Sequence, residues 1–422
     1  MKSVSIGKYM NIVFVIDMIG AQNNGTTITA MRTAKVLKDH GHQVRFIGFV
    51  PKDHSDLSDY DIMETDEMNF GPFNNVIHEN GMILSKISKE DYPKIRDFIK
   101  DADVVHLLMP FHLESQLRVL AKSMNIAVTS AMHVQPENVS YNIGLGHIRL
   151  VNSFIYWFFR HNMYRYTRNV HTPSMMMKDQ MIHHHYTNDI FPISNGVSSR
   201  FVPAVREKPE ELKDKFVILM IGRFSGEKRQ DLIIKAIGKS KYNSRIQLIL
   251  CGQGPLKKKL ENLSDKYLKN PCLFRFVNQD QLYDIINYSD LYIHSSDAES
   301  EAIACIEAFS CGKVPVISDS KVSATNHFAK DEKCLFKAGD PLSLRDRIDY
   351  FIEHPEVIKA LSPIYVEYGE TFGLDNCVKQ LEDMFEKAIY ENREEQKGNM
   401  APFYSSGREK RKLEKARKLA GI

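Results

Sequence analysis

Short apolar runs alternate with amphipathic segments along most of this chain. The clearest runs are residues 12–16, 44–50, 102–108, 126–130, 216–221, 246–250, 272–277, 291–294 and 314–317. Runs this short and this apolar are typical of strands buried on both faces, as in parallel sheets covered by helices. The pattern therefore predicts an α/β fold, and 422 residues are enough for two domains of this kind.

The stretch from Ser295 to Ser318 follows one of these runs and continues it with a loop and a helix. Residues 302–309 are rich in good helix formers, and a glycine follows where helices usually end. The start of this helix, at Ala302 and Ile303, would direct backbone N–H groups and the positive end of the helix dipole at the loop. We therefore predict an anion-binding site in this loop.

Two carboxylates flank the predicted anion site. Glu299 lies in the loop and Glu307 lies on the helix. A ligand that suits both an anion site and two carboxylates needs phosphates as well as hydroxyls. A nucleotide sugar has both, so we predict that the second half of the chain binds one.

Two more loops in the second half follow predicted strands at their carboxyl ends, where open α/β sheets bind ligands. Gly222, Arg223 and Lys228 follow the run 216–221, just before a helical pattern. A guanidinium can donate to two phosphate oxygens at once, and an ammonium group adds a point charge. Gly252 begins a Gly-x-Gly sequence after the next run, which by itself is a weak signal for phosphate binding.

Together these motifs resemble the retaining glycosyltransferases of family 4. Glu299 and Glu307 match the E-x7-E motif of that family, and the sequences around Arg223, Gly252 and residues 194–197 occur in the family's order. The resemblance implies the GT-B fold, in which two doubly wound, Rossmann-like α/β domains face each other across a cleft.

The resemblance also implies roles for these residues. In the family the second glutamate binds the nucleotide ribose and the first contacts the donor sugar, which are the roles of Glu307 and Glu299 here. Arg223 and Lys228 would neutralise the diphosphate, so neither a metal ion nor another cofactor is expected. The chain departs from the family at residues 300–302, which read Ser-Glu-Ala where many members have Gly-Phe-Gly.

The first half offers three further candidates. Gly25 and Thr26 open a helical pattern after the run 12–16. The family has a glycine-rich loop at this point that faces the acceptor and the donor phosphate, although a simple helix N-cap explains these residues equally well. His133 follows the run 126–130, where the family has a histidine that contacts the donor sugar. The alternative interpretation is that His133 is a structural loop histidine, hydrogen-bonded to the backbone.

Domain boundaries follow from composition and from the resemblance. Residues 192–203 are rich in Pro, Gly, Asn and Ser, which predicts a hinge. We expect an acceptor-binding domain over 1–192 and a nucleotide-sugar-binding domain over 193–371. By resemblance, a helix over 372–393 returns to the first domain, and 394–422 form a linker and a basic tail.

Charge and cysteine content narrow the choice of partners and compartment. A net charge of +3 gives no whole-chain case for nucleic acid, and we expect no such partner. The six cysteines lack disulfide or zinc spacing, and the first apolar run is too short for a signal peptide. We therefore expect a cytoplasmic protein with reduced cysteines.

A membrane surface is the partner that residues 147–170 favour. This segment mixes aromatic and basic side chains, among them Trp157, Arg160 and Arg165, as interfacial helices do. The basic residues of 408–419 favour the same anionic surface, on the inner face of the cell membrane. The alternatives are a core helix with solvated arginines and a solvated, disordered tail.

Residues 299–325 and 133–138 resemble bacterial enzymes that glucosylate diacylglycerol. This implies a retaining hexosyltransferase that moves glucose from UDP-glucose to a lipid such as diacylglycerol. Enzymes of capsule, teichoic acid or exopolysaccharide synthesis remain open as alternatives. So does a nucleotide-sugar epimerase on the same fold.

Overall fold

The computed structural model describes residues 9–20, 25–52, 54, 56–69, 71, 83–142, 145 and 148–422. The chain forms two compact units. The first comprises Met1–Pro136, Arg149–Asn195 and Cys377–Ile422, and the second comprises Glu137–Ile148 and Gly196–Asn376. Both are parallel-sheet α/β structures, as the apolar runs predict.

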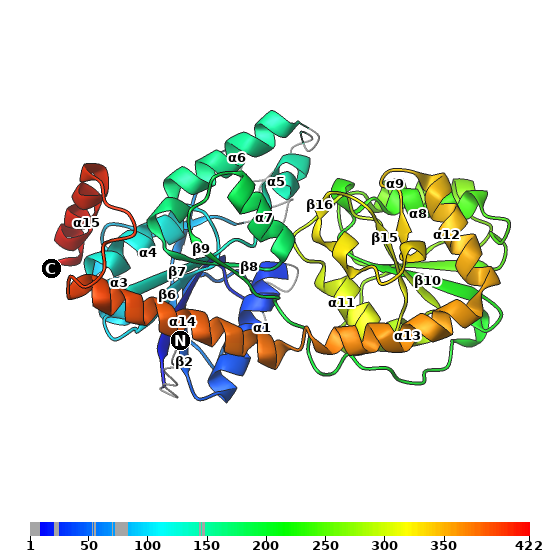
Figure 1. Cartoon of the computed structure of the whole chain (residues 1–422), viewed down its shortest axis with the longest axis horizontal. Helices are drawn as coiled ribbons and strands as arrows, with labels where there is room; N and C mark the ends of the chain where they lie inside the picture. Colours follow the sequence, from blue (N-terminus) through cyan, green and yellow to red (C-terminus); the bar gives the residue numbers. More distant parts are fainter. Residues whose placement is uncertain are drawn as a thin grey trace. The chain divides into compact units, whose positions relative to one another are not determined.

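The first unit is built on a seven-stranded parallel sheet in the order β3-β2-β1-β6-β7-β8-β9 (Figure 1). Its strands are β1 (Asn11–Met18), β2 (Gln43–Phe49), β3 (Asp61–Glu64), β6 (Val104–Leu107), β7 (Ala127–Ala131), β8 (Asn169–Thr172) and β9 (Asp189–Pro192). A short antiparallel pair, β4 (Asp66–Glu67) and β5 (Ser85–Lys86), lies beside it. The strand order runs outward in both directions from β1 and β6, which makes the sheet doubly wound.

Helices on both faces bury this sheet, and Ile12 to Ile16 of β1 are at most 2% exposed. The helices of this part of the chain are α1 (Gly25–Asp39), α3 (Tyr92–Ile99), α4 (His112–Ser123), α6 (Arg149–Asn162), α7 (Met175–His183), α14 (Leu374–Gln396) and α15 (Gly407–Ala420). The helix α14 packs here through Phe385, whose ring lies against Phe14 and His106. The C-terminal part of the chain therefore completes the core of the first unit.

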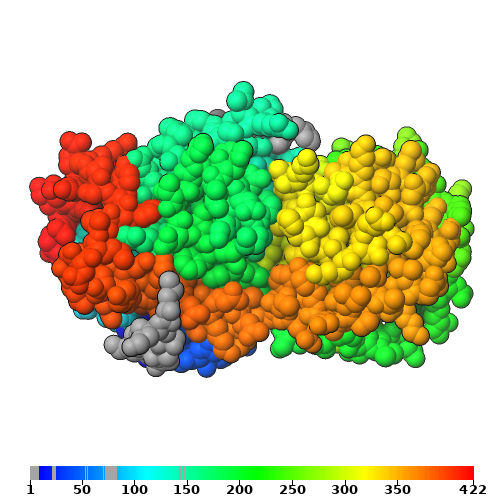
Figure 2. All heavy atoms as spheres, viewed as in Figure 1, coloured from blue at the N-terminus to red at the C-terminus, as the bar shows by residue number. Residues whose placement is uncertain are grey.

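In place of the expected linker and tail, residues 407–420 form the helix α15, which packs on α3 and α4. Figure 2 shows its atoms, in red, directly against the rest of the first unit. Its inward side carries Glu409, Ala416 and Ala420, all buried, and its basic residues mostly face outward. Basic composition alone suggests a solvated tail, but the small and apolar residues at helical spacing provide a packing face.

The second unit is built on a six-stranded parallel sheet in the order β12-β11-β10-β13-β15-β17. Its strands are β10 (Phe216–Ile221), β11 (Ile246–Cys251), β12 (Leu273–Arg275), β13 (Leu291–His294), β15 (Pro315–Ser318) and β17 (Leu335–Phe336). Its helices are α5 (Pro136–Asn142), α8 (Gln230–Lys239), α9 (Lys257–Tyr267), α10 (Gln279–Tyr288), α11 (Ile303–Ser310), α12 (Pro341–Glu353) and α13 (Pro355–Glu370). A separate short ladder, β14 (Ala298–Glu299) with β16 (Val322–Ser323), lies next to α11.

Candidate donor site

Three loops of the second unit meet at the carboxyl edge of its sheet. The loop after β10 bonds to the loop after β11, since Gly222 and Phe224 donate to the carbonyls of Cys251 and Gln253, each at 2.9 Å. A Cβ at position 252 would lie 2.1 Å from the carbonyl oxygen of Gly222. Gly252 is therefore required for the close approach of two backbones, a structural reason that the weak Gly-x-Gly signal did not reveal.

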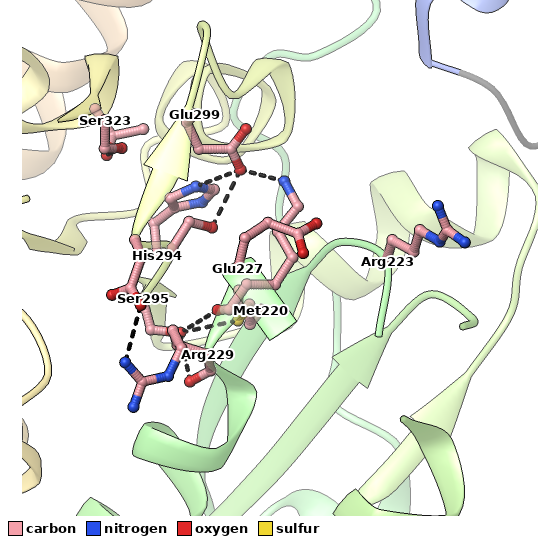
Figure 3. Close-up of polar contacts among 12 residues, drawn as sticks. Met220, Arg223, Glu227, Arg229, His294, Ser295, Glu299 and Ser323 are labelled. Carbon is pink, nitrogen blue, oxygen red and sulfur yellow. Dashed lines mark hydrogen bonds and ion pairs between the residues drawn. The ribbon is translucent and has the colours of Figure 1, made fainter. Parts of the chain in front are cut away.

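Lys228 and Glu299 form an ion pair between the loops after β10 and β13 (Figure 3). Oε1 of Glu299 also lies 3.0 Å from Nε2 of His294 and accepts a hydrogen bond of 3.1 Å from the hydroxyl of Ser296. Burial by itself raises the pKa of this carboxyl, but Lys228 and His294 together hold it at about 2. Glu299 is therefore an ionised carboxylate in a buried position.

Arg229 fixes the same two loops from another side. It has a left-handed backbone (φ 54°) and donates to Asp231 at 3.0 Å and to Asp297 at 2.9 Å. The backbone N–H of Asp297 donates to the carbonyl of Glu227 at 2.7 Å. These bonds hold Lys228 opposite Glu299.

Arg223 begins in the same loop as Lys228, but its side chain takes another direction. Figure 3 shows its guanidinium turned away from Glu299. The structure thus brings Lys228 and Glu299 together and leaves Arg223 to one side of that pair.

The predicted helix N-terminus is present, with α11 starting at Ile303. The residue before it, Ala302, caps the helix in a left-handed conformation, at φ 68° and ψ 65°. The first backbone N–H groups of any helix lack partners within the helix, so they point outward from this end. Glu307, on α11, is 5% exposed.

The first-unit candidates lie at the carboxyl edge of the other sheet. Gly25 and Thr26 are the first two residues of α1, and the next residue, Thr27, donates to the carbonyl of Met18 at 2.9 Å. His133 follows β7, and its ring packs edge-to-face on His171 at 5.1 Å. Burial and His171 lower the pKa of His133 well below its usual value, which makes it a neutral imidazole.

The helix α6 has a buried side and an exposed apolar side. Tyr156 and Phe159 are buried, whereas Leu150, Phe154 and Trp157 are 83%, 61% and 50% exposed. Phe158, on the same helix, is also 45% exposed. The rings of Phe154 and Trp157 stack at 5.7 Å on the outer face.

The two arginines predicted to act with Trp157 differ in their surroundings. Arg160 is partly exposed on α6, near its C-terminal end. Arg165 instead stacks on the ring of Tyr404 and donates to its hydroxyl. It therefore fastens the segment before α15 to the first unit, a contact that favours a structural role.

Within the described ranges, no group of three or more His, Cys, Asp or Glu side chains is arranged to hold a metal ion. In the same part of the chain no helix is long and apolar enough to cross a bilayer.

Sequence reasoning missed His294, Ser296 and Arg229. His294 and Ser296 lie at the carboxyl end of β13, a few residues before Glu299, and that position was the available signal. Arg229 directly follows Lys228 in the sequence and offered no pattern that separates it from other surface arginines.

Two family models match the chain. The model described as "Glycosyltransferase Family 4" matches residues 23–201, and the one described as "Glycosyl transferases group 1" matches residues 202–364. A solved glycosyltransferase from Rickettsia africae superposes with a TM-score of 0.69 at 18% identity, over 90% of this chain and 99% of its own. The fold assignment rests on likenesses of this kind.

Two further relatives match part of the chain. The phosphatidylinositol N-acetylglucosaminyltransferase GPI3 subunit of Saccharomyces cerevisiae is 25% identical over 199 residues, which are 41% of this chain and 44% of that protein. The chain thus spans less than half the length of the curated relatives it matches. The catalytic domain of the cholesterol-α-glucosyltransferase from Helicobacter pylori is 41% identical, covering 37% of this chain and 98% of that domain, with a TM-score of 0.36.

Proposed function

Because the chain belongs to the glycosyltransferases with the GT-B fold, we propose that it is a retaining hexosyltransferase with a lipid acceptor. The position of Glu299 is the observation that supports the donor-binding part of this proposal. Among the described residues, Oε1 of Glu299 has three donors while none is found for Oε2, so Oε2 is available to a sugar hydroxyl. Lys228 and the start of α11 supply positive charge from the same group of loops.

In this mechanism the bond from the anomeric carbon to the diphosphate breaks, and negative charge develops on the leaving group. Lys228, Arg223 and the N–H groups at Ala302 and Ile303 stabilise that charge, so no metal ion is required. The acceptor hydroxyl attacks on the same face and passes its proton to the departing phosphate.

The remaining candidate residues hold the donor. Glu307 accepts hydrogen bonds from the ribose, and His133 contacts the sugar as a neutral imidazole. By the family resemblance, Gly25 and Thr26, at the start of α1, would bind the donor phosphate and face the acceptor. Gly222 and Gly252 shape the loop that carries Lys228.

A lipid acceptor is favoured by the exposed apolar face of α6, formed by Leu150, Phe154, Trp157 and Phe158. The chain would work as a peripheral protein on the inner face of the cell membrane. A lipid acceptor also agrees with the name of the yeast relative, a phosphatidylinositol glycosyltransferase subunit. We propose UDP-glucose as the donor and diacylglycerol as the acceptor. The name of the same relative favours N-acetylglucosamine as the second candidate for the transferred sugar.

The test is release of UDP by the full chain with each donor, in the presence of anionic vesicles that contain diacylglycerol. We expect turnover with one donor, a glycolipid product with retained anomeric configuration, and weaker activity at high salt. Activity indifferent to vesicles and salt would contradict the lipid acceptor, and sugar isomerised without acceptor would indicate an epimerase.

Arg223→Ala should lower turnover by at least about a hundredfold, because it removes one group that stabilises the leaving diphosphate. The matched control is Arg206→Ala, an exposed arginine of the second unit that pairs with Asp284 and should leave turnover unchanged. Near-normal turnover of the Arg223 variant would remove this residue from the mechanism.

A further inference from the structure

Glu299 is the last member of a chain of contacts that begins at Tyr292 on β13. The hydroxyl of Tyr292 lies 3.2 Å from Nδ1 of His294, and Nε2 of His294 lies 3.0 Å from Oε1 of Glu299. The three side chains are 0%, 1% and 6% exposed. Tyr292 and His294 are two residues apart on one strand, so their rings stack on the same face of the sheet.

The partners of His294 define where its proton lies. Glu299 is ionised and can only accept a hydrogen bond, so a neutral His294 donates to it through Nε2. Nδ1 then carries no proton and accepts from Tyr292, whose phenol stays protonated because burial raises its pKa well above the usual value. Contacts on both ring nitrogens thereby hold the imidazole in one orientation.

In the proposed reaction Lys228 interacts with two groups, the carboxylate of Glu299 and the diphosphate of the donor. In this structure it pairs with Oε1 of Glu299, yet the same ammonium group is needed at the diphosphate. If Lys228 were the only donor, its movement to the diphosphate would leave a buried carboxylate without compensation, which is costly. His294 and Ser296 donate to the same oxygen and stay in place.

We propose that His294, oriented by Tyr292, is a positioning residue that keeps Glu299 directed at the donor sugar while Lys228 turns to the diphosphate. This inference rests on the proposed function, since it requires that Glu299 binds the sugar. It adds two residues, Tyr292 and His294, that do not follow from the glutamate motif.

The test compares His294→Leu, which removes the donor, with His294→Gln, which keeps an N–H group at about the reach of Nε2. We expect His294→Leu to lower kcat by about tenfold to a hundredfold, the usual effect of losing a hydrogen bond to a charged group. The Kd of UDP alone should stay within about twofold of the wild-type value, because UDP lacks the sugar that Glu299 holds. His294→Gln should recover most of the lost kcat.

The pH profile separates positioning from packing. Since His294 helps to keep Glu299 ionised, the acidic limb of kcat/KM should move to higher pH in His294→Leu and remain in place in His294→Gln. Tyr292→Phe keeps the shape of the core and should lower kcat severalfold. This variant tests the positioning role if His294→Leu fails to fold. A wild-type kcat in these variants overturns the positioning role. So do equal losses of kcat in His294→Leu and His294→Gln together with an unchanged acidic limb of kcat/KM. A wild-type chain that turns over no nucleotide sugar overturns the proposed function and this inference with it.

Discussion

Arg118 and Glu409 form a buried ion pair although 291 positions separate them in the sequence. The guanidinium is 0% exposed and also stacks on the ring of Tyr166 at 4.3 Å. Two further bonds fasten α15 nearby, from Arg96 to the carbonyl of Ala420 at 2.6 Å and from Arg417 to the carbonyl of Ser123 at 3.0 Å. The C-terminal helix is thus an integral part of the first unit.

We expect Glu409→Gln to destabilise the chain by about 3 kcal/mol, because it leaves the buried Arg118 without a countercharge. Urea unfolding followed by circular dichroism measures the loss. The matched control is Glu414→Gln, on the exposed side of the same helix, which should change stability by less than about 0.5 kcal/mol. Equal effects of the two substitutions would show that the ion pair does not hold α15 in place.

Ala302 has a left-handed backbone at the start of α11, where a Cβ costs roughly 1–2 kcal/mol. Glycine relieves this strain but loses more chain entropy on folding, so we expect Ala302→Gly to stabilise the chain by about 0.5 kcal/mol. Ala360→Gly, at an exposed position inside α13, should instead destabilise it by about 1 kcal/mol. Thermal unfolding measures the sign of the stability change for each substitution. A loss of stability in Ala302→Gly would contradict backbone strain at this position.

Asp17 on β1 is 3% exposed and accepts a hydrogen bond of 2.7 Å from the backbone of Ser85. Burial raises its pKa from 3.8 to about 7, and Asp17 together with burial raises the pKa of Glu114. Between about pH 4 and 7 the unfolded chain therefore holds fewer protons than the folded chain at this site, so its contribution to stability falls as pH rises. Asp17→Asn removes this contribution.

The stability of Asp17→Asn relative to the wild type should accordingly increase from pH 4 to pH 7. Denaturant unfolding at several pH values measures the difference, and Asp179→Asn, at an exposed position on α7, serves as the control with no expected trend. Parallel stability curves for Asp17→Asn and the wild type would show that this carboxyl titrates alike in both states.

Phe154 and Trp157 on the outer face of α6 should contact a membrane. We expect the double substitution Phe154→Ser and Trp157→Ser to weaken binding to anionic vesicles by at least about tenfold, because two large apolar side chains no longer leave water. Vesicle sedimentation measures binding. Val205→Ser is the control, since Val205 is 95% exposed in the second unit. If the double variant binds as the wild type does, the α6 face is not the membrane contact.

Sequence predicted the α/β class and most strands of both sheets, because a strand buried on both faces is a local apolar run, as at residues 12–16 and 216–221. It also singled out Lys228 and Glu299. The ammonium group of Lys228 suits a phosphate and the carboxylate of Glu299 suits sugar hydroxyls, and this chemistry does not depend on the tertiary structure. Short or partly polar strands such as Asn169–Thr172 had too little apolar pattern to be recognised.

Tertiary packing decided what such patterns leave open. The helix α6 carries apolar side chains on all of its sides, so its sequence does not show which side is buried. Packing against the sheet buries Tyr156 and leaves Trp157 exposed. The charge of residues 408–419 is visible in the sequence, but the burial of Glu409 depends on Arg118, which no local pattern connects to it. The fold of the loop after β13 brings the carboxylate of Glu299 within 3.0 Å of the ring of His294. Local sequence determines which elements form and which chemistry they carry, whereas partners across long separations are decided by the close packing of those elements.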